Sequence, residues 1–204
     1  MTHFGRWGAR RRQGSRLSAR AREQEHMSEG RGVVAERLPS WATVRRRLVK
    51  GRFQDEDHFS YERDVYENVG TSTREATRLA WERFEQLYDD FVDEAYAFTN
   101  PLRLWREITT KSLETMRLDA DIGVYWSWDP RAAEAHWGDD GRVWMLVAEV
   151  FPNQVDWPGT IWANLASPEE KEIRLKSNAT LRLLRIRDER GQIVEGFAPK
   201  VVRA

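Results

Sequence analysis

Residues 72–101 read STREATRLAWERFEQLYDDFVDEAYAFTNP, a stretch with clear signals for the start and the end of a helix. Ser72 and Glu75 have the S-x-x-E spacing of a capping box, in which the two side chains satisfy free backbone amides at the start of a helix. Asn100-Pro101 is a pair that ends a helix. Between these signals, apolar residues recur at helical spacing: Ala76, Ala80, Phe84, Leu87, Phe91, Ala95 and Phe98. The pattern predicts one long amphipathic helix.

After Pro101 the apolar spacing becomes that of β-strands. Six short segments rich in aromatic and β-branched residues are predicted as strands: Leu102–Thr109, Ile122–Trp128, Arg142–Phe151, Glu172–Lys176, Ala179–Arg187 and Ile193–Phe197. Residues 144–150 are apolar on both faces except at Glu149, which indicates a central strand. Within residues 181–187 the alternation slips at Leu184, which indicates a β-bulge.

Two shorter helices are predicted ahead of the long one. Trp41, Val44 and Leu48 share a face in a helix over Ser40–Val49. A second helix is predicted over Tyr61–Val69. Because helices come first along the chain and strands later, the sequence predicts an α+β fold.

The start of the chain is basic although the whole chain is neutral. The 204 residues carry 33 Lys and Arg against 33 Asp and Glu, yet Met1–Arg52 holds fourteen Arg or Lys and four Glu. Residues 1–37 also lack apolar periodicity, so we expect a disordered basic tail there. A single domain is expected over residues 38–204, helical at 38–100 and strand-rich at 101–204. Such an arm suits an anionic partner, which leaves nucleic acid, a membrane surface and the protein's own acidic domain as candidates.

Composition narrows the possible chemistry. The absence of Cys excludes disulfides, a thiolate nucleophile and Cys-ligated zinc. No apolar run is long enough to cross a bilayer. We expect a cytoplasmic protein, and among the candidates for the basic arm we expect nucleic acid rather than a membrane. Phosphate-loop, dinucleotide-turn and zinc-protease motifs are absent. His58, beside three acidic residues, could bind a metal, but a solvated acidic turn fits it better and no metal is expected.

Three segments of the strand-rich part carry polar residues suited to chemistry. Arg106 lies between apolar residues on a predicted strand. Ser127 lies between Trp126 and Trp128, and the Asp129-Pro130 pair that follows predicts a short helix through Trp137. Glu170-Lys171-Glu172 opens a later strand.

This order of motifs resembles the ADP-ribosyltransferase superfamily of the Arg-Ser-Glu triad type. That family shows an aromatic-Arg strand, then a Ser/Thr strand followed by D-P-x-x-A, then E-x-E at a late strand. Trp105-Arg106, Trp126-Ser127-Trp128 with the following D-P-R-A-A, and Glu170-Lys171-Glu172 correspond to these elements, within Leu102–Phe197. The resemblance implies N-terminal helices packed on a split antiparallel β-sandwich, NAD as a substrate, and mono-ADP-ribosyl transfer to a protein acceptor.

The resemblance also implies roles for single residues. Glu172 would stabilise the oxocarbenium-like transition state, and Glu170 would orient or deprotonate the acceptor, an arrangement that goes with arginine acceptors. Arg106 would hold a phosphate or a ribose of NAD. Ser127 would bind the nicotinamide ribose or hold Glu172 in place. Three aromatic residues could stack on the nicotinamide ring: Tyr125, Trp126 and Trp128.

The chain departs from the family pattern at two points. Trp-Ser-Trp replaces the usual S-T-S, and Glu169 permits another register of the acidic motif. We expect Pro152–Ser167 to form the loop that recognises the acceptor.

Other functions stay open. The protein could be a non-catalytic phage or mobile-element factor that binds nucleic acid through Met1–Arg52, or a transferase fold without activity. Each candidate also has an ordinary structural interpretation, since Arg106 could pair with a neighbouring carboxylate and the Trp residues could form a core.

Overall fold

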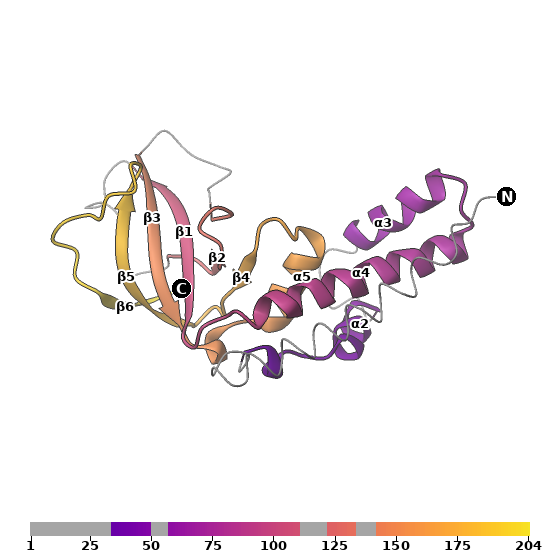
Figure 1. The fold of residues 1–204 in the computed structure, drawn as a ribbon, viewed down its shortest axis with the longest axis horizontal. Coiled ribbons are helices and arrows are strands. Elements are labelled where there is room, and N and C mark those ends of the chain that lie inside the picture. The colour runs from indigo at the N-terminus through magenta and orange to yellow at the C-terminus, as the bar shows by residue number, and fades with distance from the viewer. Residues whose placement is uncertain (1–33, 50–56, 111–121, 134–141) are drawn as a thin grey trace.

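The computed structural model describes residues 34–49, 57–110, 122–133 and 142–204, so most of the predicted basic tail lies outside the described part. Helices come first and strands later, which confirms the α+β class. A curled antiparallel sheet forms one end of the molecule, and the helices extend away from it (Figure 1). Val34 is fully buried and Ala35–Arg37 form the short 3-10 helix η1, so the ordered fold begins before residue 38.

Helix α4, Thr73–Ala95, is the long helix that the capping box predicts. The Ser72 hydroxyl accepts a hydrogen bond from the backbone N–H of Glu75 at 3.4 Å. Its apolar face is buried through Ala76, Ala80, Phe84, Leu87, Tyr88, Phe91 and Ala95. The helix stops at Ala95 rather than at Asn100-Pro101, since the Phe98 N–H bonds to the Ala95 carbonyl in a turn.

Two shorter helices pack along α4. Helix α2, Trp41–Val49, matches its predicted range, and α3, Asp57–Asn68, begins earlier than the predicted Tyr61. The ring of Trp41 lies 5.6 Å from that of Tyr88, and the Tyr88 hydroxyl donates to the Pro39 carbonyl at 2.7 Å. In Figure 1, α3 runs above α4 and α2 lies below it.

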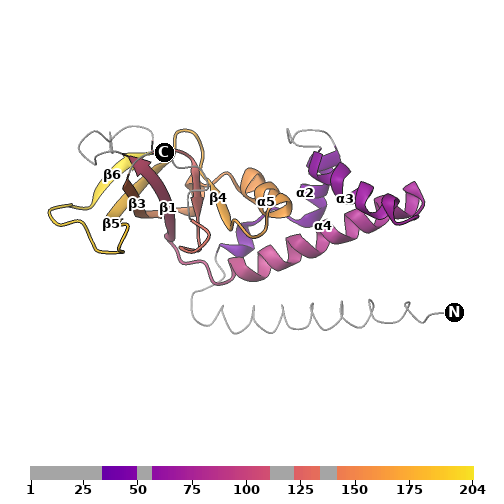
Figure 2. The ribbon, with the colours of Figure 1, turned by 90° about the horizontal axis from the view of Figure 1, so that it is seen from above.

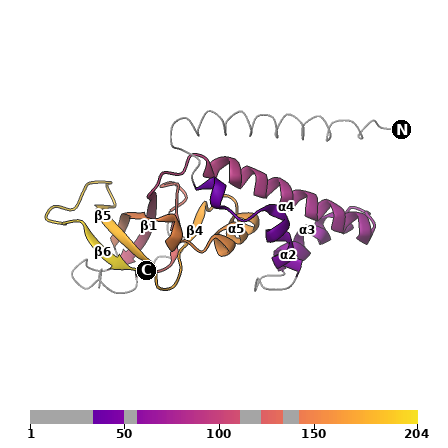
Figure 3. The ribbon, with the colours of Figure 1, turned by 90° about the horizontal axis from the view of Figure 1, so that it is seen from below.

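The six strands of the described residues form one antiparallel sheet in the order β4-β2-β1-β3-β5-β6. They are β1 Leu102–Thr110, β2 Tyr125–Ser127, β3 Arg142–Val150, β4 Glu172–Arg174, β5 Thr180–Asp188 and β6 Lys200–Arg203. The inner position of β3 confirms the predicted central strand. Val147 pairs with Arg185 while Ala148 pairs with Leu183, so Leu184 is the extra residue of the predicted bulge. The sheet curls strongly (Figure 3), and all six of these strands belong to it.

Several boundaries differ from the prediction. Strand β2 covers only Tyr125–Ser127, toward the end of the predicted Ile122–Trp128. Ile193 contributes one bridge to Arg187 in place of a strand over Ile193–Phe197, while the unpredicted β6 pairs with β5. The described residues after Asp129-Pro130 form a turn rather than a helix, and residues 134–137 lie outside the described part.

The stretch expected to be an acceptor-recognising loop contains a helix instead. The 3-10 turn η2, Pro152–Gln154, leads to α5, Trp157–Ala166. Asp156 caps α5 by accepting a hydrogen bond from the Gly159 N–H at 3.3 Å. Because apolar side chains surround most of this short helix, no amphipathic pattern marks it in the sequence. Helix α5 packs between α4 and β4 (Figure 2).

One hydrophobic core joins the helices to the sheet. Phe84 of α4 and Ile161 of α5 belong to the same buried cluster as Leu104, Leu146 and Ile186 on three neighbouring strands. The helical and strand-rich parts are therefore stabilised together, since each buries apolar surface against the other.

Candidate functional site

The three predicted motifs meet on three neighbouring strands. Strand β2 pairs with β1 on one side and with β4 on the other. Trp105 pairs with Ser127, and Ser127 pairs with Glu172. Residues opposite each other in an antiparallel ladder project to the same face, so these three residues form one row across the sheet.

Beyond this row, β1 and β2 separate. The backbone N–H of Glu107 bonds to the carbonyl of Ala133 at 2.9 Å instead of continuing the ladder to β2. The Arg106 guanidinium takes the place of the missing backbone bond, and its Nη1 donates to the Tyr125 carbonyl at 2.8 Å. Arg106 therefore lies in a split of the sheet.

The Arg106 side chain approaches β2 from the other face. Successive residues of a strand point to opposite faces, so Arg106 leaves β1 opposite to Ser127 and Glu172. Gly123 makes room for the guanidinium: a Cβ atom there would lie 2.4 Å from Arg106 Nη1, and the Gly123 φ of +85° favours glycine. The residues of the predicted triad are close neighbours in the sheet, but they do not project from a single face.

Ser127 organises the turn that carries the two glutamates. Its side chain is buried, with 4% of its surface exposed. The hydroxyl lies 3.1 Å from the Glu170 carbonyl and 3.0 Å from the Lys171 carbonyl, to which it donates, and it accepts a hydrogen bond from the Asp129 N–H at 3.1 Å. Of the two roles that the resemblance implies, this geometry fits holding the Glu172 strand in place.

The outer edge of β4 is covered by polar side chains of α5. Asn164 donates to the Glu172 carbonyl at 2.7 Å, and the Thr160 hydroxyl accepts from the Arg174 N–H at 2.9 Å. Edge strands expose unpaired backbone groups, and here two side chains one helical turn apart satisfy them. Strand β4 is thus held on both sides. The signal in the sequence is the pair of polar residues Thr160 and Asn164, at i, i+4 spacing within an otherwise apolar stretch.

Residues 170–172, called the acidic turn below, contain an unusual backbone conformation. Lys171 has a φ of +51°, in the left-handed region that side-chain-bearing residues seldom adopt. Its carbonyl accepts a hydrogen bond from the backbone N–H of Trp128 at 3.2 Å. The acidic turn is therefore fixed against the end of β2.

Glu172 is a half-buried ionisable group of the site. Burial of the side chain raises the pKa of this carboxyl, and the charge of Glu170 raises it further, while Arg174 and Arg106 lower it. A carboxylate in such surroundings is poorly solvated when ionised, so it interacts strongly with positive charge that develops nearby. Glu172 is thus suited to stabilise a cationic transition state.

The three aromatic candidates lie in different environments. Trp126 is 3% exposed and its indole N–H donates to the Gly123 carbonyl at 2.9 Å, so its ring belongs to the core rather than to a ligand surface. Tyr125 is 49% exposed, and the guanidinium carbon of Arg174 lies 5.3 Å from its ring centroid. Trp128 packs against Phe98 with ring centroids 5.1 Å apart. Tyr125 and Trp128 are the two that adjoin open space.

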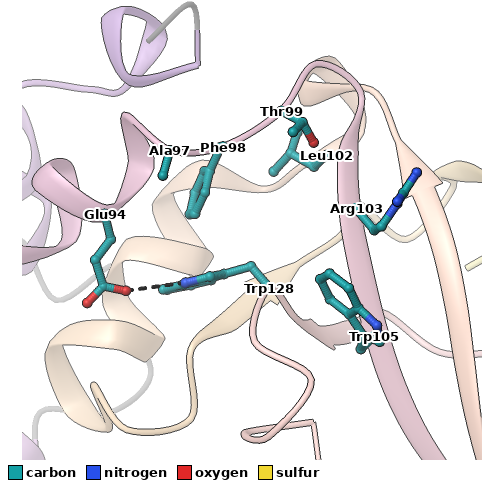
Figure 4. Close-up of a pocket in the computed structure, with 8 residues that line it drawn as sticks. All are labelled: Glu94, Ala97, Phe98, Thr99, Leu102, Arg103, Trp105 and Trp128. Carbon is teal, nitrogen blue, oxygen red and sulfur yellow. Dashed lines mark hydrogen bonds between the residues drawn. The ribbon is translucent and has the colours of Figure 1, made fainter. Parts of the chain in front are cut away.

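A pocket of about 330 Å³ opens beside Trp128, between the end of α4 and β1 (Figure 4). It is lined by Glu94, Ala97, Phe98, Thr99, Leu102, Arg103, Trp105 and Trp128. Trp105 belongs to the same row as Ser127 and Glu172, so this aromatic pocket adjoins the face from which the Glu172 side chain projects.

In comparisons with known proteins, no family model matches the sequence, no curated protein matches it, and no solved structure matches it. The function must therefore be inferred from the site itself. Within the described ranges, no three His, Asp or Glu side chains gather as metal ligands would. No helix in the same part of the chain has the length and apolar character needed to cross a membrane.

Proposed function

We propose that this protein is an NAD-dependent mono-ADP-ribosyltransferase that modifies a protein acceptor on arginine. The observation that carries the proposal is the placement of Glu172. Its carboxyl has a pKa that burial raises, and it stands on a strand that is held from both sides, by β2 and by Asn164. The finer fold belongs to the same proposal, in which the gap between β1 and β2 is the split of an ADP-ribosyltransferase sandwich.

In the proposed reaction, the bond between the nicotinamide nitrogen and C1′ of its ribose breaks, and the electron pair leaves with nicotinamide. The ribose becomes an oxocarbenium-like cation. Ionised Glu172 stabilises this charge, and partial burial strengthens the interaction because less water screens it. The acceptor nitrogen then bonds to C1′ and loses its proton to Glu170.

The remaining residues receive roles that fit their contacts. Arg106 offers a planar guanidinium for a phosphate or ribose of NAD, from the split between the strands. Ser127 acts by holding the acidic turn, and Trp126 acts by packing in the core. Tyr125 and Trp128 are the rings available for stacking on the nicotinamide.

Turnover of a fluorescent etheno-NAD by the full chain tests the proposal, with water, agmatine and arginine-rich protein offered as acceptors. Glu172→Gln keeps the shape of the side chain and removes its charge. We expect it to lower turnover about 100-fold, the usual cost of losing one transition-state charge contact. Glu189→Gln is the control, because Glu189 is exposed and follows the end of β5, outside the acidic turn, and it should retain wild-type turnover. Absence of turnover by the wild type with every acceptor, or equal rates in wild type and Glu172→Gln, would contradict the proposal.

A further inference from the structure

Glu94, near the C-terminal end of α4, contacts Lys171, the middle residue of the acidic turn. Its Oε1 lies 2.5 Å from the Nζ of Lys171. Its Oε2 accepts a hydrogen bond from the indole N–H of Trp128 at 3.3 Å, which Figure 4 shows. Lys171 Nζ in turn lies 5.8 Å from the centroid of the Trp128 ring. Side chains from α4, from the end of β2 and from the acidic turn thus form a closed network.

The backbone of Lys171 needs such support. A left-handed conformation costs an L-residue about 1–2 kcal/mol, and glycine usually occupies it. Conformations of this kind persist where the surroundings fix them, and they occur often at functional sites. At Lys171 the carbonyl is held by β2 and the side chain by Glu94. The directions of Glu170 and Glu172 both follow from this one conformation, because they flank it.

We propose that Glu94 is a positioning residue, which holds Lys171 and thereby sets the relative placement of the Glu170 and Glu172 carboxylates. The role in catalysis rests on the proposed function, whereas the role in geometry does not. The Lys171 and Glu94 side chains are 28% and 40% exposed. Ion pairs of this exposure contribute about 0–1 kcal/mol to stability. The main effect of Glu94 is therefore expected on rate and local order, with little change in melting temperature.

Glu94→Gln is the direct test, since the amide keeps an acceptor for the Trp128 indole and removes the charge that binds Lys171. We expect kcat to fall about tenfold while KM for NAD changes less than about twofold, because the carboxylates are misplaced and the NAD contacts remain. Hydrogen exchange at the Trp128 amide, which bonds to the Lys171 carbonyl, should become about tenfold faster. Glu82→Gln is the control, because it removes an α4 carboxylate that pairs with Arg78. It should change neither readout.

Substitutions of Lys171 separate the side chain from the backbone. Lys171→Ala loses the ion pair and keeps the backbone penalty, so it should lower kcat at least as much as Glu94→Gln. Lys171→Gly loses the same ion pair but adopts a positive φ without cost. We expect Lys171→Gly to be several-fold more active than Lys171→Ala, a reversal of the usual order for glycine and alanine.

The two readouts distinguish failure of this proposal from failure of the transferase assignment. An active wild type, with Glu94→Gln equal to it in kcat and in Trp128 exchange, would overturn the role of Glu94 and leave the transferase standing. An inactive wild type would remove the transferase, and exchange at Trp128 would still decide the positioning role. Faster exchange in Glu94→Gln would support that role, and unchanged exchange would overturn it.

Discussion

The two halves of the sheet are built in different ways. Strands β1 and β3 pair along their full length, from Leu102–Val150 to Thr110–Arg142. On its other side, β3 pairs with β5, and this ladder contains one bulge. On the other side, β1 and β2 pair only at Trp105–Ser127, and β2 and β4 are each three residues long. The first half is a regular ladder, and the second is a set of short strands.

The difference lies in how backbone groups are satisfied. In the regular half, strands bond to strands. In the irregular half, side chains replace missing strand partners: Arg106 bonds to the Tyr125 carbonyl and Asn164 to the Glu172 carbonyl. A side chain used in this way is fixed in position, and it fixes its partner. The irregular half is therefore where polar groups are held in defined places, which a binding site requires.

The largest effect on stability is expected in the regular half. Leu146 on the central strand β3 is fully buried, so Leu146→Ala leaves a cavity and should lower the free energy of unfolding by about 3 kcal/mol. Denaturant titration measures this. A decrease of less than about 1 kcal/mol in the free energy of unfolding would show that β3 is not the stable centre of the sheet. The regular half would then not be the more stable of the two.

An intermediate effect on stability is expected from two glycine substitutions, one outside the site and one beside Arg106. Gly70 and Gly123 both have φ of +85°, but a Cβ atom at Gly70 meets nothing within 4 Å, while one at Gly123 meets the Arg106 guanidinium. Gly70→Ala should cost about 1 kcal/mol for the backbone alone. Gly123→Ala should cost about 2 kcal/mol and also weaken NAD binding, because Arg106 is displaced. Equal costs in thermal unfolding, with unchanged NAD affinity, would show that Arg106 is not held in the split.

The smallest effect concerns pH and Glu172. Its folded-state pKa is raised above the ordinary 4.5, so the folded state binds this proton more tightly than the unfolded state does. Ionised Glu172 therefore destabilises the fold, and the penalty grows as pH rises from about 4.5 through the raised pKa. Glu172→Gln should be more stable than wild type at pH 7 by less than about 1 kcal/mol, given solvent screening, and equal to it near pH 4. Melting temperatures of the two proteins across this range check the sign.

The regular features followed well from the sequence. The capping box at Ser72 and the apolar repeat after it located α4, and the slip at Leu184 located the bulge. These features arise from local periodicity, which a single sequence displays. The adjacency of the strands that carry Arg106, Ser127 and Glu172 was expected only through the family resemblance.

The supporting contacts could not be predicted in the same way. Glu94 meets Lys171 across 77 positions of the chain, and no local pattern encodes such a pairing. Helix α5 has apolar residues around most of its surface, so no amphipathic pattern predicts it. The contacts of Thr160 and Asn164 with β4 could therefore not be predicted either. The side chains of Arg106 and Ser127 point to opposite faces of the sheet because of the register between β1 and β2, which the sequence leaves open.

The most direct test of the account is to locate NAD on the protein, using a crystal of Glu172→Gln soaked with NAD so that the substrate survives. We expect the nicotinamide ribose to lie against residue 172, with a phosphate or ribose hydroxyl bonded to Arg106 at the split between β1 and β2. NAD bound remote from β4, for example along α2 and α4, would contradict it, as would a fully soaked crystal with no NAD at all.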